Sequence, residues 1–149
     1  GSLEKHVLAA VSDGTFDSWA EYLEKDSKHL RHIESHQPTF NAGVFVTDLS
    51  RWHEQEILEK LEGWITRHRL ALEDFYFGTQ SIMNLAFYRD FQHLPSAWNV
   101  QPLGWYDDIP EETLQNGKIL HWAGKRKPWL ADGLYKEYWI DYAIGQEPG

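Results

Sequence analysis

The run Val7-Leu8-Ala9-Ala10-Val11 is apolar throughout and ends at the turn-forming residues Ser12-Asp13-Gly14. A short, uninterrupted apolar run that stops at a turn is typical of a buried strand. Further along the chain, Gly43-Val44-Phe45-Val46-Thr47 is a second run rich in β-branched residues, which predicts another strand. Residues 91–95 and 118–122 are predicted to form two more short strands.

Helical patterns separate these predicted strands. Ser50 is the predicted N-cap of a helix in which apolar positions recur at helical spacing, namely Ile57, Leu61, Trp64, Ile65 and His68. Another helix is predicted from about Thr79 to Tyr88, and an aromatic helix over 134–142 is expected to close the chain. The polar segment 17–35 predicts one or two helical pieces, whereas 101–117 is rich in Pro, Gly and Asp and predicts a loop. Strands that alternate with helices indicate an α/β fold with a mixed or parallel sheet.

The composition bounds the classes of protein that this chain can represent. Its 149 residues, 42% of them hydrophobic, predict a single domain over residues 1–149. The net charge of −9 argues against nucleic acid or an anionic membrane as the main partner. The absence of cysteine excludes disulfides, thiol nucleophiles and Cys-type zinc sites, and no apolar run approaches the ~20 residues of a membrane span. The opening Gly1-Ser2 resembles the remnant of a cleaved tag, so the natural start is expected upstream.

Three of the eight histidines invite a metal hypothesis. His29, His32 and His36 are spaced i, i+3, i+7, which places them on one face if the segment is helical. Such a face could bind Zn²⁺ or Ni²⁺, but no carboxylate or supporting partner accompanies it. A solvated polar face is therefore the favoured interpretation of these histidines.

Two other segments carry candidate binding residues. Asn41 stands at the mouth of a predicted strand just before Ala42 and Gly43, where its amide can both donate to and accept from a sugar hydroxyl. The alternative is an ordinary turn into the strand. The segment 121–129 joins an imidazole, a glycine turn, three consecutive cations and Pro128-Trp129, which suits phosphate binding. The alternative there is a solvated basic turn with Trp129 packed into the core.

Together these segments resemble the C-terminal half of a glycosyltransferase family 8 catalytic domain. Four motifs occur in the order of that family: Ala9-Ala10-Val11-Ser12-Asp13, Phe40-Asn41-Ala42-Gly43-Val44 with Leu49-Ser50-Arg51-Trp52, Leu94-Pro95 with Trp98-Asn99-Val100, and His121-x-x-Gly124-x-x-Lys127-Pro128-Trp129. The resemblance implies the C-terminal part of a GT-A-type nucleotide-diphospho-sugar transferase fold, with a mixed sheet flanked by helices. It also implies a Golgi lumenal protein if the chain is animal-type and a cytoplasmic one if it is bacterial.

The resemblance further implies a retaining transferase that is Mn²⁺-dependent and takes a UDP-sugar as donor and a glycan or other hydroxyl compound as acceptor. Carried over by motif, His121 is the expected metal ligand, and Gly124 and Lys127 are expected to hold the donor diphosphate. The expected catalytic residues are Gln80, Asn41 and Asp13. Gln80 matches the glutamine of an Asp-Gln pair near the anomeric carbon, and Asn41 is expected to contact the transferred sugar or the acceptor.

This chain departs from the family pattern at two points. Thr79 stands where the family usually has the aspartate of the Asp-Gln pair, and a hydroxyl cannot supply a carboxylate charge. No Asp-x-Asp motif occurs in the 149 residues, so the Mn²⁺ site is expected to be incomplete. The chain is therefore expected to be a partial family 8-like domain that lacks the Asp-x-Asp half and has little or no transferase activity alone.

Several alternatives remain open at this point. An inactive transferase-like module could bind glycans through exposed aromatic side chains, and the candidates are Trp98, Trp105, Tyr106, Trp122 and Trp129. A protein-interaction domain could instead use the acidic segments 17–36 and 50–68. An incomplete sheet would leave an uncovered edge, which predicts a homodimer or pairing with a complementary N-terminal half.

Overall fold

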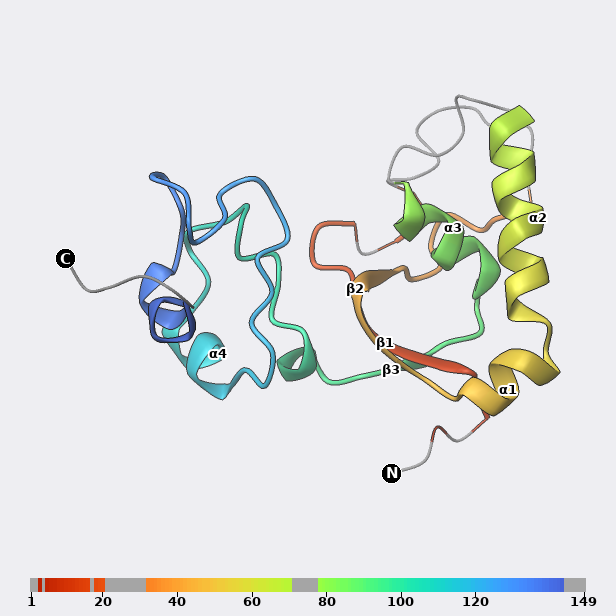
Figure 1. Ribbon diagram of the computed structural model, residues 1–149, viewed down its shortest axis with the longest axis horizontal. Coiled ribbons are helices and arrows are strands. Elements are labelled where there is room, and N and C mark those ends of the chain that lie inside the picture. Colours follow the sequence, from red (N-terminus) through yellow and green to blue (C-terminus); the bar gives the residue numbers. More distant parts are fainter. Residues whose placement is uncertain (1–2, 4, 17, 21–31, 71–77, 144–149) are drawn as a thin grey trace. The chain divides into compact units, whose positions relative to one another are not determined.

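The computed structural model describes residues 3, 5–16, 18–20, 32–70 and 78–143, and of residues 68–70 only the backbone (Figure 1). The chain forms two compact units, Gly1–Ser96 and Ala97–Gly149. Each unit has buried hydrophobic residues of its own. The single domain expected over 1–149 stays a prediction.

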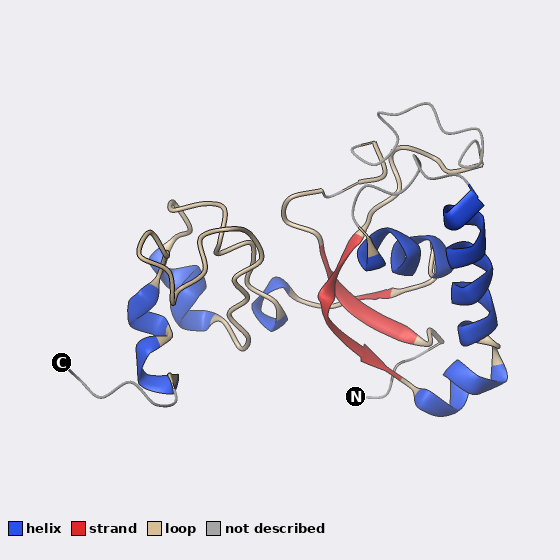
Figure 2. Cartoon of the chain, turned by 45° about the horizontal axis from the view of Figure 1, so that its top comes forward, coloured by secondary structure: helices blue, strands red, loops and turns tan. Residues whose placement is uncertain are grey.

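The first unit is built on a three-stranded mixed sheet of order β2-β1-β3 (Figure 2). The central strand β1 (Leu8–Ser12) pairs antiparallel with β2 (Phe40–Thr47) and parallel with β3 (Gln92–His93). Its residues 8–11 are all buried, which explains why they form a continuous apolar run rather than an alternating one. These strands and the mixed sheet confirm the prediction.

Three helices accompany the sheet: α1 (Leu49–Glu54), α2 (Ile57–Leu70) and α3 (Thr79–Ala86). α3 contacts both β2 and α2, so it lies between the sheet and the longer helix (Figure 1). The prediction of a helix from Thr79 is thus confirmed at its start, and the helix ends two residues earlier than Tyr88.

The predicted N-cap was wrong. Asp48 caps α1, because its Oδ1 accepts hydrogen bonds from the backbone N–H groups of Ser50 (3.0 Å) and Arg51 (3.1 Å). Ser50 therefore lies inside the first turn of the helix. The helix is also interrupted at Glu56, whose φ of 52° is left-handed, and it resumes as α2.

The apolar stripe of α2 is narrower than predicted. Ile57 is buried, Leu61 and Trp64 are half-buried, and Ile65 is exposed. The side chain of His68 lies outside the described residues. A narrow stripe is enough here because α2 packs on α3 and α1 rather than on the sheet.

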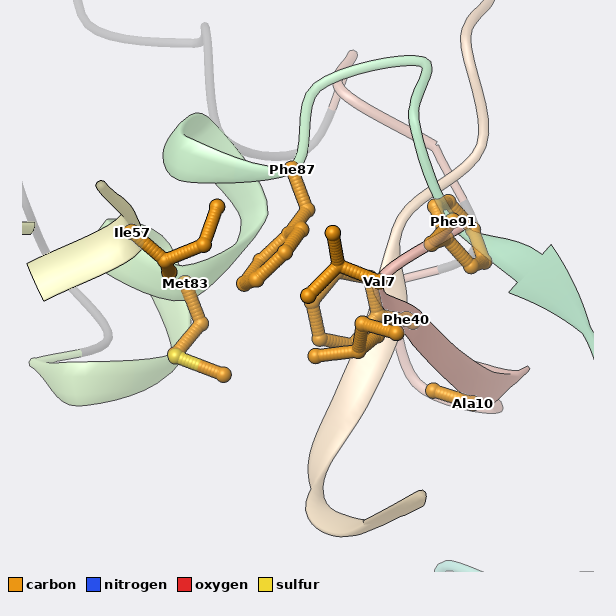
Figure 3. Packing of buried hydrophobic residues seen from close by; sticks show 8 residues of the cluster. Val7, Ala10, Phe40, Ile57, Met83, Phe87 and Phe91 are labelled. Atoms are coloured by element: carbon orange, nitrogen blue, oxygen red, sulfur yellow. The ribbon is translucent and has the colours of Figure 1, made fainter. Parts of the chain in front are cut away.

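Phe87 lies at the centre of the main hydrophobic core (Figure 3). Figure 3 shows Ile57 and Met83 on one side of its ring and Val7 and Phe40 on the other. The rings of Phe40 and Phe91 extend this packing, with centroids 4.8 Å apart. Residues from strands and helices thus pack around β1, and Asp13, a candidate site residue, directly follows this strand.

The second unit contains little regular structure. The predicted strand 118–122 makes a single parallel bridge, Val100↔Leu120, and a second isolated bridge, Gly104↔Gly124, follows it. The expected loop 101–117 instead contains a short helix, α4 (Glu111–Asn116), which follows Pro110. Glu111 and Glu112 lie in its first turn, where negative charge favours a helix start. Val100, Leu103 and Leu114 form the core of this unit.

The predicted aromatic helix at the end is also wrong in type. Residues 134–142 form two 3₁₀ turns, η3 (Lys136–Tyr138) and η4 (Ile140–Tyr142), because Tyr135 has a left-handed φ of 51° that an α-helix does not tolerate. None of the described helices is long and apolar enough to cross a membrane.

The helical pieces expected in segment 17–35 fall largely on residues 21–31, which lie outside the described residues together with His29. The described part, residues 18–20 and 32–35, contains turns and one isolated bridge, Ser18↔Pro38, and no helix. His32 and His36 are exposed there, and nothing in the described residues forms a metal-binding group around them.

Candidate functional site

Asp13 is the first residue after β1 and is only 3% exposed. Its Oδ1 accepts hydrogen bonds from the backbone N–H groups of Thr15 (2.7 Å) and Phe16 (3.0 Å). These bonds fix the turn that follows the strand. The second carboxylate oxygen of Asp13 is directed to a different element of the fold.

That second oxygen, Oδ2, accepts a hydrogen bond of 2.5 Å from Nε2 of Gln80, in the first turn of α3. The Oε1 atom of Gln80 accepts from the backbone N–H of Ala42, at 3.1 Å. A carboxylate only accepts and a backbone N–H only donates, so the two contacts set which end of the Gln80 amide points in each direction.

Asn41 precedes Ala42 on β2 and is buried. Its Oδ1 accepts from the N–H of Gly43 at 3.0 Å, which orients the side-chain amide along the strand. Since Gln80 contacts both Asp13 and the residue beside Asn41, the structure gathers the three residues predicted to be catalytic at one end of the sheet.

Asn84 supports this group, and sequence reasoning missed it. Its Oδ1 accepts from the N–H of Phe40 (2.8 Å), and its Nδ2 donates to the C=O of Phe40 (2.9 Å) and of Gln80 (3.0 Å). Asn84 thereby holds α3 to β2 as a neighbouring strand would. The available signal was an amide placed among apolar positions of a helix, four residues after Gln80.

Thr79 is the first residue of α3 and is exposed. The N-cap residue before it, Gly78, has no side chain that could cap the helix. Thr79 thus presents a hydroxyl, where the family pattern has a carboxylate, beside the Gln80–Asp13 pair.

In the second unit, His121 is oriented by Asn99, which is 1% exposed. Its Nδ1 lies 3.0 Å from Oδ1 of Asn99. An amide oxygen only accepts, so this contact requires the proton on Nδ1 and makes Nε2 the lone-pair nitrogen of the neutral ring. This is the tautomer that a metal ligand of the Nε2 type needs.

Gly124 allows two backbone segments to approach each other closely. Its φ is +118°, and a Cβ built there would lie 2.4 Å from the carbonyl carbon of Gly104. The Gly104 N–H donates to the carbonyl of Ala123 (2.8 Å), and the Arg126 N–H donates to the carbonyl of Gly104 (3.0 Å). Packing alone therefore requires a glycine at 124, whatever it binds.

The three cations after this glycine differ in their surroundings. Lys127 is half-buried and donates from Nζ to the carbonyl of Trp122, while Arg126 pairs with Asp107 at 3.3 Å. Lys125 lies 5.6 Å from the centroid of the Trp105 ring. Lys127 is thus held next to the segment that bears His121, and phosphate binding by these cations stays a prediction.

Trp129 is 59% exposed, with its ring centroid 6.1 Å from that of Trp139. Trp129 is therefore not packed into the core, and this part of the alternative is wrong, whereas the solvated basic turn stays open.

The described residues fit only part of a metal site. Nowhere in the described ranges do three His, Asp or Glu side chains gather closely enough to hold an ion. His121 is a single candidate ligand in the correct tautomer, and the described residues alone do not complete a Mn²⁺ site.

The chain belongs to glycosyl transferase family 8, whose family model matches residues 2–133. It is 28% identical to glycosyltransferase 8 domain-containing protein 2 of Bos taurus, over 99% of this chain and 43% of the relative. It is 29% identical to glycosyltransferase 8 domain-containing protein 1 of Danio rerio, over 91% of this chain and 40% of the relative. The chain thus spans about two fifths of the length of these curated relatives.

Solved structures agree with this assignment. The glycosyltransferase GlyE of Streptococcus pneumoniae TIGR4 matches 98% of this chain and 35% of its own, with a TM-score of 0.67 and 26% identity. The bifunctional glycosyltransferase WbbM matches 97% of this chain and 29% of its own, with a TM-score of 0.71 and 21% identity, which shows the fold alone. The family resemblance and the predicted α/β fold of the GT-A type are confirmed.

Proposed function

We propose that this chain forms the acceptor side and part of the diphosphate site of a retaining glycosyltransferase that moves a hexosyl or related sugar from a UDP-sugar to a hydroxyl acceptor. Membership of family 8 supports glycosyl transfer in general. The observation that carries the finer proposal is the hydrogen bond between Asp13 and Gln80, which brings two polar residues far apart in sequence to one strand end.

The amides of Gln80 and Asn41 suit a sugar. Each has donor and acceptor atoms in one plane, the arrangement that pairs of sugar hydroxyls require. Both amides are oriented by hydrogen bonds to the protein, Gln80 by Asp13 and Asn41 by the N–H of Gly43. Oriented amides lower the entropic cost of fixing a sugar beside the reacting carbon.

The second unit supplies groups for the leaving diphosphate. The ammonium of Lys127 offers positive charge and hydrogen-bond donors to phosphate oxygens. His121 presents the nitrogen that would bind Mn²⁺. When bound, the metal would neutralise the charge that develops on the diphosphate.

Saturation-transfer NMR with UDP-glucose and UDP-galactose tests this proposal. The residues that we assign to the donor contact its sugar and diphosphate rather than its uracil. Saturation is therefore expected to reach the hexose protons more strongly than the uracil protons. Gln80→Ala is expected to reduce the hexose signal, and the matched variant Gln55→Ala, at the exposed end of α1, to leave it unchanged. Equal signals from both variants, or saturation confined to uracil, would contradict the proposal.

The alternative is a transferase-like module without catalysis, which binds glycans or another protein. Thr79 favours this alternative, because it stands beside Gln80 where the family usually has an aspartate, and its hydroxyl supplies no negative charge. Such a module would bind neither UDP nor a UDP-sugar, so the same experiment separates the two functions.

A further inference from the structure

An open groove of about 660 Å³ lies in the second unit, between α4 and the two closing 3₁₀ turns. This volume is in the range of sites for small molecules. Four aromatic side chains and two carboxylates contribute to its lining: Trp122, Tyr138, Trp139, Tyr142, Glu137 and Asp141. None of these residues is assigned to the donor sugar or the diphosphate above, and Trp122 is also a candidate glycan contact in the alternative function.

The protein itself holds the aromatic rings of this groove in place. Nε1 of Trp122 donates to the carbonyl of Leu134 at 2.8 Å, and the hydroxyl of Tyr138 donates to the carboxylate of Glu111. The ring of Trp139 contacts that of Trp129, with a centroid separation of 6.1 Å. Two of the rings thus have their polar atoms satisfied within the protein, so what they offer a ligand is mainly apolar ring surface, already oriented.

Hydrogen-bonding groups accompany this ring surface. Within the described residues, the carboxylates of Glu137 and Asp141 take part in no hydrogen bond or ion pair, so both can accept from a ligand. Lys118 is the cation among the lining residues, against two carboxylates. The local excess of negative charge repels an anionic ligand and is neutral toward an uncharged one.

We propose that this groove binds a neutral oligosaccharide. Sugar rings present C–H faces that pack on fixed aromatic surfaces, and hydroxyls that donate to carboxylates. The mixture of oriented rings and unpaired carboxylates matches both properties, whereas an acidic saccharide would meet like charge. The proposal does not depend on donor binding, since it uses none of the residues assigned to the UDP-sugar.

The test is a titration of the ¹⁵N-labelled chain with maltotriose, cellotriose and N,N′,N″-triacetylchitotriose, and with trigalacturonate as an acidic counterpart. At least one neutral trisaccharide is expected to shift the indole signals of Trp122 and Trp139. Tyr142→Ala is expected to weaken that binding about fivefold or more. Because Tyr142 is 81% exposed, the variant keeps its packing. The matched control Tyr106→Ala removes an exposed tyrosine outside the groove and is expected to bind normally.

A second variant separates a binding role from a structural one. The double substitution Glu137→Gln with Asp141→Asn removes the negative charge and is expected to admit trigalacturonate, which the unmodified chain rejects. The proposal is overturned if no neutral trisaccharide shifts the groove signals, if Tyr142→Ala and Tyr106→Ala bind equally, or if the acidic trisaccharide binds the unmodified chain as well as the neutral ones. Failure of the UDP-sugar experiment would leave these outcomes unaffected.

Discussion

Nε2 of Gln80 donates a 2.5 Å hydrogen bond to Oδ2 of Asp13, joining residues 67 positions apart. The bond ties the start of α3 to the end of β1. Because Oε1 of Gln80 also accepts from Ala42, the amide has one permitted orientation. The same contact that holds the helix to the sheet thus orients the side chain assigned to the sugar.

Gln80→Glu should therefore destabilise the chain. The new carboxylate would face the carboxylate of Asp13 and lose the N–H donor, at a cost of about 1–3 kcal/mol in free energy of unfolding. Urea denaturation checks this, with Gln55→Glu as a matched exposed control expected to change stability little. Equal stability of the two variants would show that the Asp13–Gln80 bond contributes nothing.

Gly124→Ala should destabilise the second unit strongly. A Cβ at this position lies 2.4 Å from the backbone of Gly104, and the φ of +118° is strained for any other residue. The expected cost is about 3 kcal/mol or more. The control is Gly63→Ala, in α2, where a Cβ would meet no atom within 4 Å and the change should stabilise by about 0.5–1 kcal/mol. Urea denaturation would contradict this account if both substitutions were neutral.

Much of the first unit could be predicted from the sequence. The apolar run at β1 and the β-branched run at β2 are long and local signals, and both strands were predicted. The break between α1 and α2 and the N-cap of α1 were harder to predict. The break depends on the backbone angle of Glu56 alone, and the cap depends on the side-chain rotamer of Asp48. In the second unit, single bridges stand where a strand was predicted and 3₁₀ turns stand where an α-helix was predicted. Tertiary packing, rather than local sequence pattern, determines these conformations.

The residues of the candidate site could be predicted from the sequence, but the hydrogen bonds between them could not. Spacing and resemblance selected Asp13, Asn41 and Gln80. Only the fold shows that Asp13 and Gln80 are hydrogen-bonded and that Asn41 lies beside Ala42, whose N–H donates to Gln80. Asn84 was missed because its role is to pair with backbone groups, which leaves no motif. The sequence also does not reveal that Gly104 requires a glycine at 124.

The pair Tyr138–Glu111 predicts a pH effect. A hydrogen bond to Glu111 raises the pKa of Tyr138 from 10.0 to about 12 and, with a smaller contribution from Gln115, lowers the pKa of the Glu111 carboxyl. The raised pKa favours the neutral phenol, so its stabilising effect is present below pH 10 and is lost between pH 10 and about 12. The lowered carboxyl pKa gives a contribution that is lost at the acid end, as pH falls through the folded-state pKa.

Ultraviolet titration of tyrosinate checks this pair. The difference between the unmodified chain and Tyr138→Phe isolates Tyr138, and in a Glu111→Gln background its midpoint should move down toward 10.0. Glu112→Gln, which changes the neighbouring exposed glutamate, should leave the midpoint in place. A midpoint that does not respond to Glu111→Gln would refute the assignment.

The neutral imidazole of His121 should carry its proton on Nδ1. The reason is the 3.0 Å contact with Oδ1 of Asn99, which only accepts. Imidazole ¹⁵N shifts measure the tautomer directly. Asn99→Ala should abolish the preference of His121 for the Nδ1-protonated tautomer. His53, which is exposed on α1, serves as the reference ring. A proton on Nε2 in the unmodified chain would remove His121 as the Nε2 ligand.

We propose that this chain contributes the acceptor side and part of the diphosphate site of a family 8 transferase. Calorimetric titration of UDP, with and without Mn²⁺, tests it most directly. The account predicts weak, Mn²⁺-dependent binding that is lost in His121→Ala and kept in the exposed control His53→Ala, with little or no sugar transfer by this chain alone. Absence of UDP binding under both conditions, or binding indifferent to Mn²⁺ and to His121→Ala, would contradict it.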